Sequence, residues 1–249
     1  MGDREVFIEH DQSHRRLVCL WGNDGFELGR IANMCGSRPH AEGPGALAHF
    51  QSSLPGQGGS RVSVDHVLRV CWSAPNAVSS CLGSPDGVFY AAEISETAIA
   101  EKAFYRLLFY LESPDTPWPS NPSEYTAFAT EFAVANAVDL TRESLVAQRA
   151  LWTHHTDYTA CLALADTARA ASLDAIRYQS VRDPEGRANI ALLTCRAFIG
   201  RDLIDSRTWR LFFDSHGVRA YCEFPRTWLE FERTAFDADA RMAPMRWDR

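Results

Sequence analysis

Lysine is almost absent from this chain. Lys102 is the only lysine among 25 basic residues, so the other 24 are arginines. We attribute this bias to a GC-rich coding sequence, and any group that clamps a phosphate in this protein has to be an arginine. The formal net charge is −7. It argues against nonspecific binding of nucleic acid, which needs a basic face.

Long hydrophobic runs are also missing. No apolar stretch is long enough to span a membrane, and residues 1–16 lack the apolar centre of a signal peptide. The seven cysteines form no CxxC pair, which favours reduced thiols over a disulfide framework. We therefore expect a soluble protein of the cytoplasm.

Two common kinds of site find no support in the motifs. No GxGxxG sequence follows a predicted strand, so a Rossmann dinucleotide site is not indicated. His154, His155, Asp157 and Cys161 are residue types that bind metals, but no second pair of ligands accompanies them. We interpret these four as polar residues at the start of a helix and expect no metal.

The length and the apolar content allow one domain with a substantial core, since 46% of the 249 residues are hydrophobic. Predicted strands and helices alternate irregularly, which favours an α+β fold over a doubly wound sheet. Residues 36–84 are rich in Gly, Ser and Pro and are expected to form loops. We predict strands at 88–90, 126–138, 175–179, 189–193, 209–213 and 219–224, and helices at 95–111, within 139–152 and at 158–172.

Glu101 is a carboxylate on a helical face that is otherwise mostly apolar. Ser95 is suited to be the N-cap of this helix, and no Gly or Pro interrupts residues 98–111. A carboxylate on such a face is partly desolvated, which raises its pKa and is typical of catalytic groups and of structural networks alike. An ordinary surface glutamate is the alternative. The neighbours of Glu101 at three- and four-residue spacing are Thr97, Ala98, Phe104 and Tyr105.

A second group of polar residues lies in a turn-rich loop between the strands at 175–179 and 189–193. Ser180 leaves the first strand, Arg182 follows two residues later, and Asn189 lies across the loop. Together they offer a hydroxyl, a guanidinium and an amide from one hairpin. Ser and Asn are also common in turns, so a purely structural loop is the alternative.

Together the two segments resemble the RES domain family. The similarity runs through GVFYAAEISETAIAE, FYRLLFY and DYTACLALADTARAASLDAIRYQSVRDPEGRANIALL, with order and spacing preserved. The resemblance implies a single domain with an ADP-ribosyltransferase-like central β-sheet and flanking helices. Its parts would be a divergent, loop-rich N-terminal segment at 1–85, a RES-like core at 86–235 and a C-terminal tail at 236–249. Matching site positions are Tyr90, Glu101 and Ser180.

The arginines of the family are harder to place. The best candidate for a Gly-Ser-Arg-Phe-Ser type motif is GSRVS with Arg61, which lies farther upstream than the family pattern. Arg38 is a second candidate, and Arg16 in HRRLV corresponds to an earlier arginine beside the first strand. Residues 35–84 do not follow the family pattern, so they are an insertion, a divergent segment or the product of a reading-frame error.

The resemblance further implies an enzyme that consumes NAD as a toxin and is paired with an antitoxin, of the Xre type, that has a DNA-binding domain. Cleavage of the nicotinamide–ribose bond leaves positive charge on the ribose, which Glu101 would stabilise. Ser180 and Arg61 would complete the catalytic set. NAD is then a substrate, and no cofactor is expected. The substrate contacts would come from Tyr90, Arg16, Arg182 and Asn189.

The acceptor of ADP-ribose is left open by the sequence. Phosphate or water is the leading expectation, and a protein or a nucleotide is the alternative. A noncatalytic protein that keeps the scaffold to bind a partner is a third interpretation, favoured by the unaligned segment 35–84. A homo-oligomer is left open as well.

Overall fold

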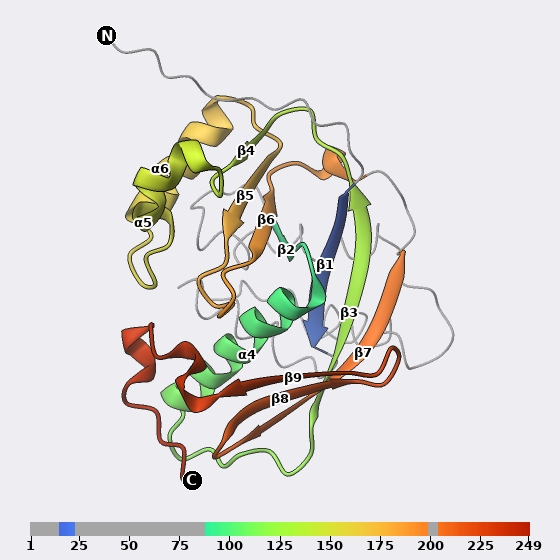
Figure 1. Ribbon diagram of the computed structural model, residues 1–249, viewed down its shortest axis with the longest axis vertical. Helices are drawn as coiled ribbons and strands as arrows, with labels where there is room; N and C mark the ends of the chain where they lie inside the picture. The colour runs from blue at the N-terminus through green and yellow to red at the C-terminus, as the bar shows by residue number, and fades with distance from the viewer. Residues whose placement is uncertain (1–14, 23–87, 199–203) are drawn as a thin grey trace, which may run out of the picture.

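Nine strands form one sheet in the computed structural model, which describes residues 15–22, 88–198 and 204–249 (Figure 1). The predicted loop segment at 36–84 therefore lies outside the described residues. The strands are β1 Arg15–Gly22, β2 Phe89–Ala92, β3 Ser123–Phe132, β4 Ala137–Asp139, β5 Ala175–Gln179, β6 Ala188–Leu192, β7 Asp205–Asp214, β8 Gly217–Cys222 and β9 Thr227–Glu232. The α-helices are α4 Ser95–Glu112, α5 Arg149–Trp152 and α6 Thr159–Ala170, and the 3-10 helices are η1 Glu143–Gln148, η2 Cys195–Ala197, η3 Arg233–Phe236 and η4 Ala240–Met242.

The sheet is almost entirely antiparallel. Its order is β4-β5-β6-β2-β1-β3-β7-β8-β9, and β4–β5 is its one parallel pair among the described strands. The parallel pair is connected through η1, α5 and α6, as a crossover requires. The predicted α+β class, with a central sheet and flanking helices, is confirmed.

Most predicted elements are present, with three differences. The strand predicted at 126–138 is two strands, because the chain leaves the β3 ladder where Ala133 N–H bonds to Ala197 O and Asn136 N–H bonds to Asp174 Oδ2. The helix predicted within 139–152 is mostly 3-10, with one short α turn. Strands β1 and β9 were not among the predicted strands.

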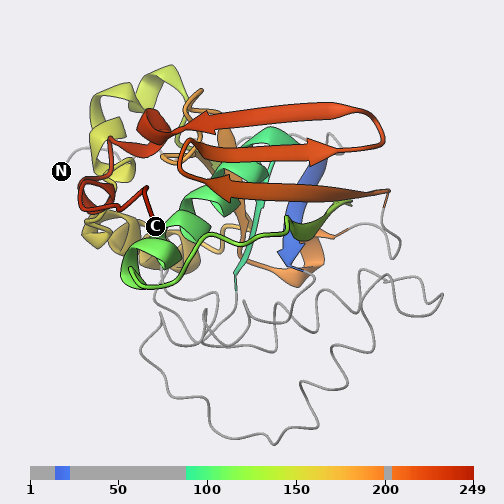
Figure 2. The ribbon, with the colours of Figure 1, turned by 90° about the horizontal axis from the view of Figure 1, so that it is seen from below.

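Helix α4 fills the centre of the larger hydrophobic core. Its sequence has good helix formers and ends just before Pro114. Phe104 and Leu107 are fully buried and pack with Trp209 of β7 and with residues of β8 and β9. Each such side chain contributes about 1.5–3 kcal/mol of hydrophobic free energy. Figure 2 shows strands β7–β9 passing beside the helix.

The N-cap prediction for α4 was wrong by one residue. Ser95 is the first helical residue, and Ile94 occupies the N-cap with φ −137° and ψ 159°. The chain is still extended at Ile94 after β2, so the carbonyl of Ile94 is the first to accept a helical bond, from Ala98 N–H at 3.3 Å.

The predicted C-terminal tail packs onto α4. Phe236, Met242 and Met245 are buried in the same core as Phe104. The Arg249 guanidinium donates to the carbonyl of Tyr110 at 2.9 Å and to that of Thr116 at 3.1 Å. A cation there satisfies carbonyls at the negative end of the helix.

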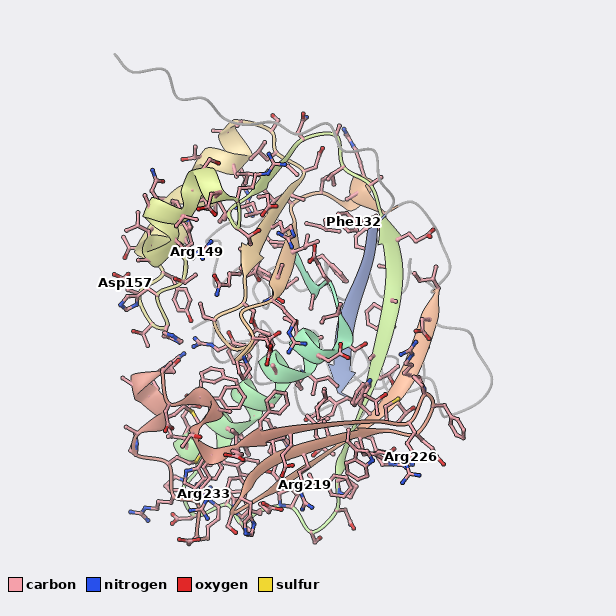
Figure 3. The ribbon with its side chains drawn as sticks, in the orientation of Figure 1. Phe132, Arg149, Asp157, Arg219, Arg226 and Arg233 are labelled. Carbon is pink, nitrogen blue, oxygen red and sulfur yellow. The ribbon has the colours of Figure 1, made fainter. Side chains whose placement is uncertain are left out.

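The opposite face of the sheet has its own smaller cluster. Phe89, Phe128 and Phe132 are buried there, with Phe198 packed against them. Phe132, labelled in Figure 3, closes β3 by a bridge to Phe198. Within the described ranges, no helix is both long enough and apolar enough to cross a membrane.

Candidate active site

Glu101 lies in the second turn of α4, on the side that faces the β5–β6 hairpin. Thr97, Phe104 and Leu108 around it are buried, so the predicted apolar face is confirmed, while Tyr105 is exposed. Glu101 itself is partly buried. The carboxylate is therefore held among protein side chains and keeps limited access to solvent.

Two donors meet on one oxygen of this carboxylate. Ser180 Oγ donates to Glu101 Oε1 at 2.6 Å, and Asn189 Nδ2 donates to the same oxygen at 2.7 Å. Ser180 and Asn189 are buried, and they come from the two strand ends of one hairpin. The second oxygen, Oε2, accepts no hydrogen bond from the described residues. The structure thus brings together three of the predicted site residues.

Backbone contacts fix the direction of the Ser180 hydroxyl. Its oxygen accepts N–H bonds from Arg182 at 3.2 Å and from Asp183 at 3.0 Å. With both lone pairs used, the single proton of the hydroxyl is left for Glu101. Ser180 is therefore a group that orients the carboxylate.

Burial raises the pKa of Glu101 above its usual value. Hydrogen bonds from Ser180 and Asn189 and the charge of Arg182 oppose this rise, and the charge of Asp183 adds to it. The net direction is upward because the desolvation of the charged form outweighs two donors on one oxygen. A carboxylate in this state is incompletely solvated and interacts strongly with a nearby positive charge.

Asp183 makes a second connection between the hairpin and α4. Its Oδ2 accepts from Thr97 Oγ1 at 2.6 Å and lies 3.0 Å from Arg187 Nε. Gly186 closes the turn with φ +63°, and a Cβ there would lie 2.6 Å from Gln179 Nε2. The positive φ favours glycine at this position, whereas the end of the flexible Gln179 side chain could move.

Arg182 is buried among protein partners. It is 3% exposed, its Nη1 lies 2.7 Å from Asp239 Oδ2, and its Nη2 donates to the His155 carbonyl at 2.7 Å. Nη1 also lies 2.8 Å from His155 Nδ1, and the guanidinium stacks on Phe104, 4.0 Å from the ring centroid. With protein partners on both terminal nitrogens, Arg182 anchors the loop, and its predicted contact with substrate stays a prediction.

The partners of Arg182 show the electrostatic consequences. Burial works to raise the pKa of Asp239, but hydrogen bonds from Arg241 and the charges of both arginines hold it below its usual value. The pKa of His155 is lowered by burial and by the charge of Arg182. A neutral His155 can accept at Nδ1 from the guanidinium, which is the arrangement that the short distance requires.

The structure places two of the other predicted site residues, Tyr90 and Arg16, on strands of the sheet. Tyr90 lies in β2 opposite Ala191 of β6. It is partly buried and packs against a third hydrophobic cluster, which includes Ala165 and Ala168 of α6. Arg16 lies in β1 opposite Glu131 of β3. Arg38 and Arg61 fall outside the described residues. Contacts of these residues with a substrate stay predictions.

The histidines before α6 have structural partners. His154 Nδ1 accepts from the backbone N–H of Asp157 at 2.8 Å, in the segment between the labelled Arg149 and Asp157 of Figure 3. Cys161 Sγ donates to the Trp152 carbonyl at 3.7 Å. In the described part of the chain, no group of three or more His, Cys, Asp or Glu residues is arranged to hold a metal ion.

Sequence analysis assigned no role at this site to Asp183, Arg187 or Asp239. Asp183 and Arg187 have the local signal of a turn around Gly186 with ion-pair spacing of four residues. Asp239 had no such signal, because its pairing with Arg182 joins segments far apart in the chain.

Comparison with known proteins places this chain in a family. The RES domain family matches residues 37–214, which includes nearly all of the segment 35–84. No curated protein matches. Among solved structures, a chain from the crystal structure of the M. tuberculosis MbcT–MbcA toxin–antitoxin complex is similar, with 11% sequence identity and a TM-score of 0.41 over 78% of this chain and 84% of that chain. Since the family match spans more than half of the sequence, this chain belongs to the RES domain family.

Proposed function

We propose that this protein is an NAD-consuming enzyme of the toxin type, which cleaves the nicotinamide–ribose bond and transfers ADP-ribose to phosphate or water. One observation carries the proposal. The Glu101 carboxylate is fixed through Oε1 by Ser180 and Asn189, while Oε2 accepts no bond from the described residues. Membership of the RES domain family supports it.

The geometry suits a reaction that develops positive charge. Loss of nicotinamide leaves an oxocarbenium-like ribose, as in glycoside cleavage. Glu101 Oε2 would contact the ribose and stabilise that cation, and the partly desolvated setting makes the interaction stronger than in water. Ser180 and Asn189 would keep the carboxylate in position without reorganisation during the reaction.

The remaining assignments follow the family. Tyr90 would stack on an aromatic ring of NAD, and Arg16 or Arg61 would bind the pyrophosphate. NAD is a substrate in this scheme and no cofactor takes part. The enzyme would act on the NAD of the cytoplasm and would be held inactive by an antitoxin of the Xre type.

Consumption of NAD by the purified protein, with and without inorganic phosphate, tests the proposal. Loss of NAD that needs phosphate identifies a phosphorylase, and phosphate-independent release of nicotinamide with free ADP-ribose identifies hydrolysis. ADP-ribose found on an added protein or nucleotide identifies the transferase alternative. A folded protein that consumes no NAD under any of these conditions overturns the proposal and favours the noncatalytic interpretation.

Asn189→Asp is expected to move the acidic limb of the activity profile to higher pH. The substitution keeps the shape of the side chain but sets a second carboxyl where Nδ2 now lies, 2.7 Å from Glu101 Oε1. Two carboxylates so close cannot both ionise, so the pair retains a proton at higher pH. In this scheme the fraction of the pair whose proton lies on Glu101 is inactive. Raising the apparent pKa of the pair by one would therefore lower the rate on that limb by up to about tenfold.

The measurement is the rate of NAD loss as a function of pH for wild type and variant. Asn121→Asp, at an exposed loop position, is the matched control and should leave the profile in place. An Asn189→Asp profile that coincides with that of the wild type would show that Glu101 ionisation does not govern the rate.

A further inference from the structure

Arg187 presents a guanidinium whose two terminal nitrogens make no hydrogen bond with the described residues, and whose Nε is paired with Asp183 through charge rather than through a hydrogen bond. Its Nε is held 3.0 Å from Asp183 Oδ2, and the side chain is 36% exposed. Asp183, in contrast, is almost completely buried. The ion pair therefore holds the Nε side of the guanidinium and leaves the two terminal nitrogens available as donors.

The anchor lies one helical turn from Glu101. Asp183 Oδ2 also accepts from Thr97 Oγ1 at 2.6 Å, and Thr97 precedes Glu101 by four residues on α4. Such positions are neighbours on one helix face, about 5–6 Å apart. Arg187 lies just before β6, and its carbonyl accepts from Ser180 N–H at 2.8 Å, so the strand pairing continues through it. Arg187 therefore shares a face of the hairpin with Asn189, two residues on. Two parallel connections therefore join α4 to the hairpin, one ending at the Glu101 carboxylate and the other at the Arg187 guanidinium.

The contrast with Arg182 shows why Arg187 is the better ligand for an anion. Arg182 is buried, and its terminal nitrogens are occupied by Asp239 and His155. Arg187 has the planar pair of donors that binds phosphate oxygens in a bidentate manner. Its anchor, one turn of α4 from a carboxylate that would serve a ribose, suits a phosphate attached to that same sugar.

We propose that Arg187 binds the phosphate on the ribose that Glu101 acts upon, and so fixes the sugar against the carboxylate. The inference rests on the proposed function and adds a phosphate contact that family motifs did not indicate. A role limited to neutralising Asp183 is the competing explanation. The two differ in what they predict for substrates with and without phosphate.

The test compares Arg187→Gln with wild type on NAD and on nicotinamide riboside, which has the scissile bond but no phosphate. We expect the KM for NAD to rise tenfold or more, about the effect of losing one charged hydrogen bond, with a smaller change in kcat. The relative kcat/KM of the two proteins on nicotinamide riboside should stay close to one. Arg187→Lys keeps the charge beside Asp183 but loses the planar pair of donors, so it should give an intermediate KM. It also provides a folded variant if Arg187→Gln does not fold.

Arg210→Gln is the matched control. Arg210 is similarly exposed and is paired with Glu124, at 2.9 Å, between β7 and β3. It should leave both KM values unchanged. Equal losses on NAD and nicotinamide riboside, or an unchanged KM for NAD in an active enzyme, would overturn the inference and leave Arg187 as the counterion of Asp183.

A binding measurement separates failure of this inference from failure of the proposed function. Calorimetric titration of NAD into the Glu101→Gln protein, with and without Arg187→Gln, reports the phosphate contact in the absence of turnover. Weaker binding by the double variant supports the inference. Wild type that neither consumes nor binds NAD overturns the proposed function, whereas an active wild type whose NAD affinity does not depend on Arg187 overturns only the role of Arg187.

Discussion

Glu101→Gln is expected to abolish most NAD cleavage while leaving a folded protein. The amide oxygen of glutamine can still accept from Ser180 and Asn189, which now bond to Glu101 Oε1. What is lost is the negative charge that would face the ribose cation. Removal of such a preorganised electrostatic group costs about 10²–10⁴ in rate.

The same substitution should increase stability at neutral pH. Burial raises the pKa of Glu101 in the folded state, so the folded chain binds the proton more tightly than the unfolded chain. Folding is then favoured as pH falls, and that advantage is lost as pH rises through the raised pKa. Glutamine carries no charge at any pH, so the variant avoids this loss.

Rates of NAD loss and denaturant unfolding curves at neutral and mildly acidic pH check both halves of this prediction. The stability gain of Glu101→Gln should shrink as the pH falls and the wild-type carboxylate takes up its proton. Glu112→Gln, at the exposed end of the same helix, should change neither activity nor the pH dependence of stability. Loss of activity that accompanies unfolding of Glu101→Gln would instead indicate a structural role for the carboxylate.

Asp239→Ala is expected to destabilise the protein by about 3–5 kcal/mol, because it leaves the buried guanidinium of Arg182 without its charged partner. Asp239 is 1% exposed and lies 2.7 Å from Arg182 Nη1. The backbone N–H of Arg182 bonds to Ser180 Oγ, so displacement of Arg182 also disturbs the hydroxyl that orients Glu101. Activity should therefore fall even at temperatures where the variant remains folded.

Thermal unfolding and NAD turnover below the unfolding transition measure the two effects separately. Asp237→Ala, an exposed position in the same segment, is the control and should behave like wild type. The double variant Arg182→Met with Asp239→Leu should recover part of the stability, because an apolar pair leaves no unpaired charge in the core. A wild-type stability for Asp239→Ala would show that water reaches Arg182 readily.

The ion pair between Arg182 and Asp239 also makes the stability of the protein depend on pH, with a sign opposite to that of Glu101. The pKa of Asp239 is held below its usual value by its arginine partners, although burial opposes them. Its contribution to stability is present above the usual carboxyl pKa and is lost as pH falls through the lowered one.

The sequence was most informative where structure is local. The helix that bears Glu101 and the strand 175–179 follow from composition and spacing, because their patterns are set by residues near in the chain. The prediction that Glu101 and Ser180 share one site depended on the family resemblance, since no periodicity links residues in separate elements. Arg182 shows the limit clearly, because its partners at His155 and Asp239 come from distant segments.

The C-terminal segment illustrates the same limit from another side. Met242 and Met245 lie in a stretch rich in charged residues, which is typical of a solvated tail. They are buried because the end of α4 and the strands β8 and β9 leave an apolar surface that they cover. No local sequence pattern in 236–249 indicates that surface.

The polar groups that hold Glu101 in place come from one short stretch, residues 180–189, and Thr97 of α4 is the helix side of the second connection. The hairpin holds its own turn together through Ser180 N–H to Arg187 O and Gly186 N–H to Asp183 O, both at 2.8 Å. The stretch is thus a compact unit with fixed contacts on the helix. Recombination between family members that exchanges this one stretch would carry over the orienting groups and the exposed guanidinium together. Under the proposed function, substrate preference would then change with this one stretch, while the helix and its carboxylate stay as they are.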